Sequence, residues 1–239
     1  PLNISGSGTS FKGNFIVKST GSGIVRLKHA TTATNIYIDG NLEIENGSLI
    51  VNAGATAGTN LYIGGDYIQT GGTFNLSSVN IACAVYLDGN YTQTGGTFDR
   101  TVGATVTTFY FRGVNKEYKQ IGGTVDNAYI NYVVLANAII TLQNDLALSS
   151  GRSFTVNASA RLNFGTKIIS GAGSTFSLAA NGTIDIGHQD GIVAIAGGNN
   201  GNIQTATRTL NAGGHYIYSG TSEQVTGSGL PATVSGTLT

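Results

Sequence analysis

Short apolar pairs alternate with polar residues along most of the chain, and no segment has the spacing of an amphipathic helix. In the second half these pairs recur at short intervals, as in Leu146/Leu148, Phe154/Val156 and Leu162/Phe164. A strand with one buried face has this alternation. Turn residues such as Ser150-Gly151 and Asn181-Gly182 separate the pairs. The pattern predicts an all-β fold of short strands with almost no α-helix.

The sequence also repeats itself. Residues 62–74 and 86–98 share the pattern Tyr-x-x-Gly-x-Tyr-x-Gln-Thr-Gly-Gly-Thr-Phe. The second glycine of each unit recurs at Gly47, Gly72, Gly96 and Gly123, a period of about 25 residues that is typical of a repeat architecture. A later set has a shorter period, in which Leu146, Phe154 and Leu162 recur as Ile168, Phe176 and Ile184.

Three short strands in each repeat of about 22–27 residues describe one coil of a parallel β-solenoid. A coil cannot bury its apolar inner edge alone, whereas coils stacked about 4.8 Å apart build a continuous core and pair nearly all backbone groups. We therefore predict a right-handed parallel β-helix of about ten coils. An antiparallel β-sandwich also has short strands, but such folds rarely repeat their sequence at the period of a whole coil.

Stacking in register places equivalent residues in columns. The predicted columns are Leu49, Phe74, Phe98 and Val125; Tyr67, Tyr91 and Tyr118; and a polar corner ladder of Asn41, Asp66 and Asn90. Side chains of the polar ladder are expected to bond along the stack. The Gly-Gly pairs are expected to form tight turns that need a positive φ.

We expect one continuous domain with three regions. Residues 1–35 match the repeat loosely and are predicted to be N-terminal capping coils, because end coils are usually atypical. Residues 36–132 carry the longer repeats, of about 24–27 residues, and residues 133–239 carry the shorter ones, of about 22 residues. Within the last region, residues 187–214 are rich in Gly and Asn and are predicted to form a protruding loop. The chain is expected to be part of a longer array.

Composition narrows the class of protein. Twelve Lys and Arg balance twelve Asp and Glu in 239 residues, which is too few scattered cations for a nucleic-acid-binding patch. Eleven Tyr and nine Phe argue against disorder, and no apolar run is long enough to insert into a membrane. The single cysteine, Cys83, lies in an apolar run and is interpreted as a small buried hydrophobic residue. Low charge with abundant Thr, Asn, Ser and Gly suggests a secreted or surface chain.

Two parts of the chain resemble a known class of protein. Residues 201–234, which include Thr-Leu-Asn-Ala-Gly-Gly-His-Tyr-Ile-Tyr-Ser-Gly, closely resemble a module of large secreted proteins of the Bacteroidota. The run Tyr-Thr-Gln-Thr-Gly-Gly-Thr-Phe at 91–98 resembles their repeats. The resemblance covers most of residues 36–239. It implies export by the type IX secretion system, a place at the bacterial cell surface and an adhesin-like or filament-like role; no catalytic residue belongs to the motif.

Parallel β-helices include enzymes that cleave polysaccharides, so clustered acids are candidates for catalysis. Asp39 and Asp88 occupy equivalent corners two coils apart, with Gly64 between them. This places the carboxylates about 9–10 Å apart, within the range of inverting glycosidases. No other acid or base converges on them, and a turn aspartate that bonds its own backbone is the favoured interpretation.

Other candidate residues lie in loops and tyrosine columns. Asp185, His188 and Asp190 have a spacing that suits a metal ion, although a loop histidine is more often solvated. The column of Tyr67, Tyr91 and Tyr118 is a candidate for stacking against sugars, or else a half-buried structural ladder. His188 and Asp190 are further candidate contacts with a glycan or partner. Neither a phosphate-binding Gly-x-x-x-x-Gly-Lys nor a regular Thr array for ice binding occurs.

The sequence therefore favours a non-catalytic structural or adhesive module of a secreted cell-surface protein, acting as a rigid spacer and contact surface without a cofactor. Its expected partners are other domains of the same parent protein, further copies, cell-surface proteins or glycans. The alternatives are a β-helix that binds or cleaves glycans and a self-assembling extracellular filament subunit, since an open coil end permits strand addition.

Overall fold

The computed structural model describes residues 9–28, 34–53, 57–100, 105–194 and 200–239. These residues form a parallel β-solenoid of about seven turns, and none of them is helical. The predicted fold class is confirmed, with fewer turns than the ten expected. One reason is that the last complete coil is long, because Ile169 pairs with Ile203, well beyond the usual repeat length.

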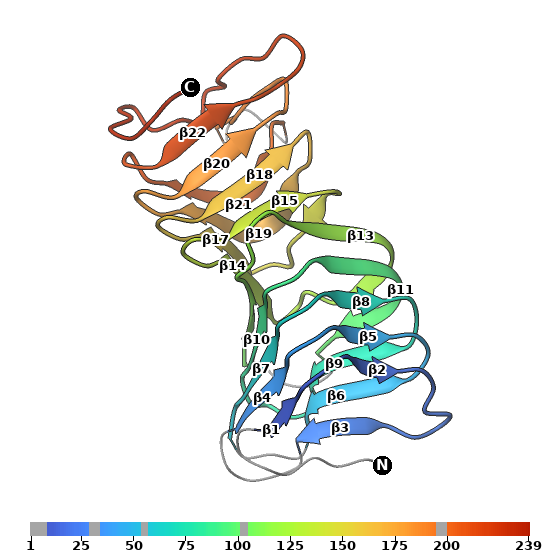
Figure 1. The fold of residues 1–239 in the computed structure, drawn as a ribbon. Helices are drawn as coiled ribbons and strands as arrows, with labels where there is room; N and C mark the ends of the chain where they lie inside the picture. The colour runs from blue at the N-terminus through green and yellow to red at the C-terminus, as the bar shows by residue number, and fades with distance from the viewer. Residues whose placement is uncertain (1–8, 29–33, 54–56, 101–104, 195–199) are drawn as a thin grey trace. The chain divides into compact units, whose positions relative to one another are not determined.

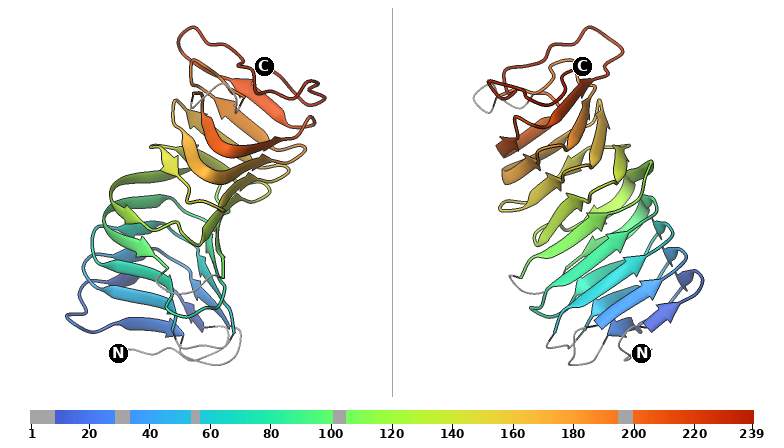
Figure 2. Two further views of the ribbon diagram at one scale, coloured as in Figure 1. Left: turned by 180° about the vertical axis from the view of Figure 1, so that it is seen from behind. Right: turned by 60° about the vertical axis from the view of Figure 1, so that its left-hand side comes forward.

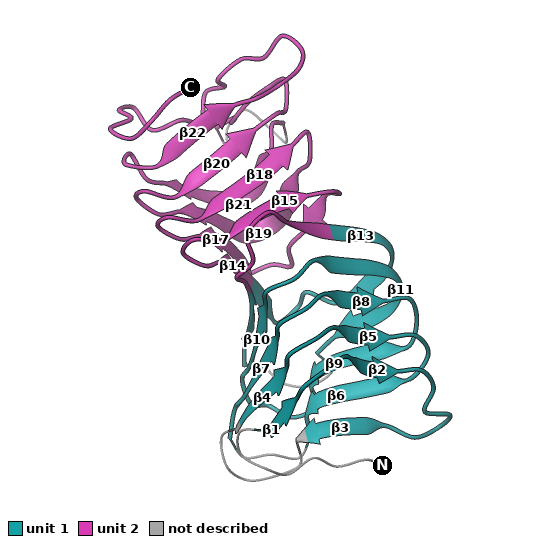
Figure 3. Cartoon of the chain, viewed as in Figure 1, with its two compact units in different colours: residues 1–110, 119–131 teal, residues 111–118, 132–239 magenta. Residues whose placement is uncertain are grey.

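The chain divides into two compact units (Figure 3). Unit 1 contains residues 1–110 and 119–131, and unit 2 contains residues 111–118 and 132–239. The predicted change of repeat length at residue 133 falls at this division. Each unit is described separately below.

Unit 1 is a stack of coils with three strand positions each (Figures 1 and 2). The first position contains β1 (Thr9–Phe11), β4 (Thr34–Ile38), β7 (Thr59–Ile63), β10 (Cys83–Leu87) and β12 (Thr107–Phe111). The second contains β2 (Phe15–Val17), β5 (Leu42–Ile44), β8 (Tyr67–Gln69) and β11 (Tyr91–Asp99). The third contains β3 (Val25–Lys28), β6 (Ser48–Asn52), β9 (Thr73–Ser77) and the second half of β11. β13 (Lys116–Val125) passes through the division between the units.

Unit 2 is wound in the same way, with shorter turns except for the long coil from Ile169 to Ile203. One row of strands contains β14 (Ile130–Val134), β17 (Ser153–Val156), β19 (Ile169–Leu178) and β21 (Ile203–Leu210), and β16 (Leu146–Ala147) pairs with the first half of β19. The other row contains β15 (Ile139–Leu142), β18 (Arg161–Gly165), β20 (Thr183–Ile186) and β22 (His215–Tyr218).

The strands pair in the predicted register. Phe74 is the partner of Leu49 on one side and of Phe98 on the other, and the Phe74 and Phe98 rings stack with centroids 5.3 Å apart. The next coil of unit 1 follows, because the backbone N–H of Asp126 donates to the carbonyl oxygen of Phe98 at 2.8 Å. Because the strand ladders are parallel, equivalent side chains point the same way in successive coils.

The polar corner ladder is confirmed, with one additional member. The side-chain oxygen of Asn14 accepts the backbone N–H of Asn41 at 3.0 Å, and Asn41 accepts that of Asp66 at 2.9 Å. Asp66 in turn accepts the backbone N–H of Asn90 at 2.7 Å and its side-chain amide at 3.1 Å. Asn14, Asn41 and Asp66 therefore each satisfy a backbone group of the next coil.

A buried polar pair recurs in two coils beside the Gly-Gly turns. Tyr67 donates its hydroxyl to Gln69 at 2.6 Å, and Gln69 donates to the carbonyl oxygens of Gly71, Gly72 and Thr97 at 3.0–3.3 Å. Tyr91 and Gln93 repeat the arrangement one coil later, with the hydroxyl and amide oxygen 3.0 Å apart. Both glutamines are fully buried, so these bonds are needed to satisfy polar groups inside the core.

The Gly-Gly turns have the predicted backbone conformation. The second glycine has φ of 61° at Gly72, 73° at Gly96 and 72° at Gly123. A side chain there would also collide with the preceding coil, because a Cβ on Gly96 would overlap the carbonyl oxygens of Gly71 and Gly72. Glycine is thus required both by the left-handed conformation and by the close approach of coils.

Two finer predictions are corrected. Leu146 pairs with Ile169 rather than with Ile168, because β18 carries an extra residue at the irregularity between Asn163 and Gly165. The predicted loop over 187–214 contains a strand, β21, whose partner β19 lies too far back in the sequence to show the usual period. In the described part of 1–35, β1, β2 and β3 pair in parallel with β4, β5 and β6, and a capping role for this coil stays a prediction.

Substitution of Gly96 by Ala tests how closely the coils approach. We expect the free energy of unfolding to fall by about 3–5 kcal/mol, the sum of a left-handed alanine and an overlap with backbone. Gly21→Ala is the matched control in the same unit, since Gly21 has φ of 56° but open space around its Cβ, and it should cost only about 1–2 kcal/mol. Urea denaturation followed by circular dichroism measures both. Equal losses would show that the coils are not in contact at this turn.

Candidate functional site

The tyrosines predicted as glycan contacts are inside the core. Tyr67, Tyr91 and Tyr118 are 0%, 1% and 1% exposed, and burial raises the pKa of the Tyr118 hydroxyl well above its usual range. Their positions in β8, β11 and β13 share the inward face with the aliphatic core, so they cannot contact a sugar in the folded chain. That prediction is wrong, and the structural-ladder interpretation holds for these residues.

A different set of tyrosines forms an outward column on unit 1. Tyr37, Tyr62, Tyr86 and Tyr110 stack with centroids 4.8, 4.6 and 4.6 Å apart and with planes 13°, 8° and 7° from parallel. All four are partly exposed. Each stands between two inward apolar residues, as in Leu61-Tyr62-Ile63. The alternation of residues along these strands therefore predicts that Tyr37, Tyr62, Tyr86 and Tyr110 face outward, in contrast to the Tyr67 column.

The two aspartates that are candidates for glycoside cleavage lie at equivalent corners, as predicted. The register of β4, β7 and β10 places Asp39 and Asp88 one residue after aligned strands, with Gly64 between them. The Asp39 carboxylate is 2.8 Å from the ammonium of Lys12, in an exposed ion pair. Asp39 is thus engaged with a surface cation on the neighbouring coil.

A further carboxylate, Asp99, has an unusual environment at the end of β11. Its Oδ1 atom is buried without a hydrogen-bond partner. Burial, followed by the charge of Asp126, raises the pKa of Asp99 from 3.8 to about 6. The ionised form is thus disfavoured in the folded chain. Sequence reasoning missed this residue, since only the coil register brings Asp126 beside it.

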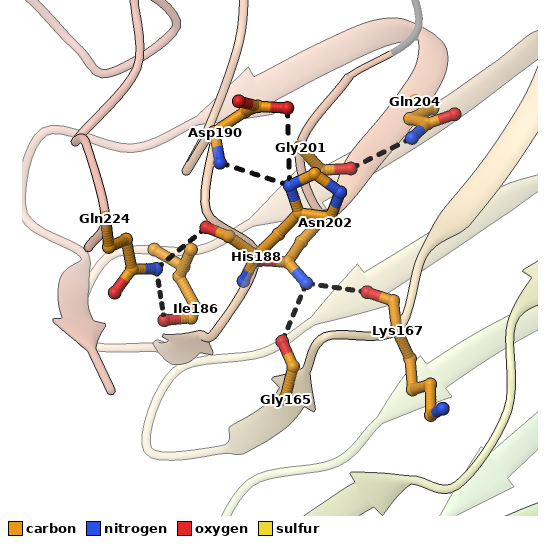
Figure 4. Close-up of polar contacts among 9 residues, drawn as sticks. All are labelled: Gly165, Lys167, Ile186, His188, Asp190, Gly201, Asn202, Gln204 and Gln224. Atoms are coloured by element: carbon orange, nitrogen blue, oxygen red, sulfur yellow. Dashed lines mark hydrogen bonds and ion pairs between the residues drawn. The ribbon is translucent and has the colours of Figure 1, made fainter. Parts of the chain in front are cut away.

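His188 follows the end of β20, and the side-chain amides of Asn202 and Gln224 hold its main chain in place (Figure 4). Asn202 is fully buried; its oxygen accepts the His188 N–H at 3.0 Å, and its nitrogen donates to the Gly165 and Lys167 carbonyls at 2.9 and 2.6 Å. Gln224 donates to the carbonyl oxygens of Ile186 and His188, both at 2.9 Å. Two distant segments therefore hold this loop onto the solenoid.

His188 and Asp190, two candidate contact residues from the sequence, lie side by side. The Nδ1 atom of His188 accepts the backbone N–H of Asp190 at 3.2 Å and lies 3.7 Å from its carboxylate. Since Nδ1 accepts a hydrogen bond, the neutral ring carries its proton on Nε2. Asp185 has other partners: it forms a 2.6 Å ion pair with Arg161 and accepts a hydrogen bond from the hydroxyl of Ser219.

The candidate metal motif is therefore not assembled from Asp185, His188 and Asp190 together. Within the described residues, no group of three or more His, Cys, Asp or Glu side chains is placed to hold a metal ion. Cys83 is buried, as predicted.

A cavity of about 350 Å³ opens beside the His188 loop. Its lining residues are Gly165, Thr166, Gly187, His188, Gln189, Ser219, Gly220, Thr221, Ser222 and Glu223. Asn202 and Gln224 hold the main chain of the lining residues Gly165 and His188, and the lining contains residues with hydroxyl, amide and carboxylate groups. This is the candidate functional site, and its lining offers hydroxyl groups, the imidazole of His188 and the carboxylate of Glu223 to a polar ligand.

Comparison with known proteins identifies no relative. The chain matches no protein-family model, no curated protein and no solved structure. The resemblance to surface proteins of the Bacteroidota therefore stays a prediction. In the described part of the chain no helix is long and apolar enough to cross a membrane.

Asp99 makes the stability of unit 1 depend on pH. The unfolded carboxyl titrates near 3.8 and the folded one near 6, so the folded state binds more protons between these values and stability falls as pH rises through them. Asp99→Asn should raise the free energy of unfolding at pH 7 by about 1 kcal/mol, after allowance for solvent screening, and the gain should vanish near pH 4. Glu45→Gln, at an exposed position of the same unit, serves as control. A gain that is equal at both pH values would contradict this assignment.

Proposed function

We propose that the chain is a non-catalytic structural module of a secreted cell-surface protein, acting as a rigid spacer and contact surface. This proposal rests on the observation that the polar side chains link consecutive coils. Asn41, Asp66 and Asn90 join consecutive coils at one corner, and Gln69 and Gln93 join them beside the Gly-Gly turns. These polar side chains are used to hold the backbones of consecutive coils together.

Rigidity supports a spacer role for each unit. Parallel strands in register bond every coil to the next, and the buried aromatic rings stack along the same direction, with centroids 5.3 Å apart for Phe74 and Phe98 and 6.0 Å for Phe154 and Phe176. Bending such a stack would break backbone bonds and ring contacts together. Stability in solenoids is therefore spread over nearest-neighbour interfaces.

The outward tyrosine column favours a structural role over sugar stacking. A sugar ring packs on the face of an aromatic ring, but the faces of Tyr62 and Tyr86 are covered by their neighbours at 4.6–4.8 Å. Only ring edges and hydroxyl groups are left for contact. The column thus stabilises the outer surface and presents a regular row of hydroxyl groups to a partner.

The proposed cell-surface location rests on composition and on the resemblance of residues 91–98 and 201–234 to surface proteins. The partners consistent with it are other domains of the parent protein, further copies of the chain, surface proteins and glycans. If the partner is another copy of the chain, the contacts lead to self-assembly into filaments.

Two assays of the purified chain test this proposal. The chain is incubated with acidic and neutral polysaccharides to detect cleavage, and it is applied to a glycan array to detect binding. We expect no cleavage, and any glycan binding should be equal in Tyr86→Ala and Tyr86→Phe, because the ring faces are covered. Cleavage that is lost in Asp39→Asn or Asp88→Asn would contradict the non-catalytic role. Glycan binding lost in Tyr86→Ala but kept in Tyr86→Phe would favour the glycan-binding alternative, and electron microscopy of the same sample detects filaments.

A further inference from the structure

Arg208 occupies an inward position of unit 2. It is the register partner of Phe176, which is fully buried and continues the stacked column of Tyr132 and Phe154, with centroids 6.1 and 6.0 Å apart. In parallel strands in register, partners point the same way. β21 thus places the partly exposed Arg208 at the strand position where the previous three coils place aromatic rings.

The Arg208 guanidinium has no counter-charge in the described part of the chain. Its one hydrogen bond there is to the carbonyl oxygen of Val193, and its Nε atom is buried without a partner. Burial lowers the pKa of Arg208, which reflects the cost of removing the cation from water. A cation that is partly withdrawn from water is normally offset by a carboxylate, and among the described residues no carboxylate forms an ion pair with Arg208.

A cavity of about 410 Å³ lies beside Arg208, between β19 and β21. Three residues of β19, 172–174, stand opposite the single residue Ala206, because Gly171 pairs with Thr205 and Thr175 pairs with Thr207. This irregularity separates the strands locally. The lining residues are Ser170, Gly171, Ala172, Gln204, Thr205, Ala206 and Arg208, none of them acidic.

The remaining polar groups of the cavity suit an anion. The Gln204 amide donates one hydrogen to the carbonyl oxygen of Gly201 at 3.0 Å, which leaves its second N–H. The Thr205 hydroxyl donates to the carbonyl oxygen of Thr207 at 2.8 Å and is fixed by that bond. Ser170 adds another hydroxyl, and the guanidinium has further N–H groups in a planar fork that matches an oxyanion.

We propose that this cavity is a binding site for an oxyanion, carried by a small molecule of about monosaccharide size, with Arg208 as the residue that pairs with it. A volume of this order lies at the lower end of the range for ligand pockets. The site is distinct from the His188 cavity and does not depend on the proposed structural role. A purely structural interpretation makes Arg208 a cap over the aromatic column, and this interpretation predicts no response to anions.

Calorimetric titration at low ionic strength distinguishes an oxyanion-binding site from a purely structural Arg208. The probes are sodium glucuronate, sodium sulfate and neutral glucose. The wild-type chain should bind glucuronate or sulfate saturably and should not bind glucose. Glucuronate binding identifies an acidic sugar as the class, and binding of sulfate alone identifies an inorganic oxyanion. Arg208→Gln should weaken either interaction at least about tenfold.

Lys167→Gln is the matched control, since it removes the same charge from a residue of unit 2 that does not line the cavity. It should bind like the wild type. Ser170→Ala, which keeps the guanidinium, should weaken binding by about threefold to tenfold and serves if Arg208→Gln does not fold. No saturable binding of either anion to the wild-type chain, or equal affinity in the Arg208 and Lys167 variants, would overturn the proposal.

Discussion

Hydrogen bonding between parallel strands in register is the interaction on which the whole structure depends. It fixes the spacing between coils at about 4.8 Å and forces equivalent positions of successive coils to point the same way. Every residue therefore has to be compatible with the residues directly above and below it. The aromatic stack of Phe74 and Phe98 and the outward stack of Tyr62 and Tyr86 are both consequences of this constraint.

The same constraint decides where side chains are excluded and where polar groups are retained. At the Gly-Gly turns the backbone of one coil touches the backbone of the next, so that only hydrogen fits at Gly96. At the corners, the side-chain oxygens of Asn41 and Asp66 meet the backbone N–H of the coil that follows. Inside, the side-chain amides of Gln69 and Gln93 donate to the carbonyl oxygens of Thr97 and Thr124 on the next coil. Polar residues in this chain therefore act mainly as links between coils.

Sequence reasoning succeeds where the repeat is regular and fails where one residue or one insertion breaks it. The pairing of Phe74 with Phe98 follows from the identical Gln-Thr-Gly-Gly-Thr-Phe segments of consecutive repeats. The hydrophobic pattern misplaces the partner of Leu146 by one position, because the irregularity after Asn163 leaves no mark in it. It predicts a loop where β21 lies, because the excursion that contains His188 displaces this strand from the usual period. Equally, an inward arginine such as Arg208 contradicts the simple rule of apolar inside and polar outside, so that only the register reveals its direction.

Engineered disulfides measure the register directly. Ile68 and Thr92 are outward partners on adjacent coils, and a separation of about 5 Å between Cα atoms suits a disulfide. Ile68→Cys combined with Thr92→Cys should form the bond in high yield under mild oxidation, as detected by peptide mass spectrometry. The pair Ile68→Cys and Thr94→Cys, displaced by two positions along the strand, should form little of it. Equal yields, or preferential formation in the displaced pair, would contradict a solenoid with like residues stacked one coil apart.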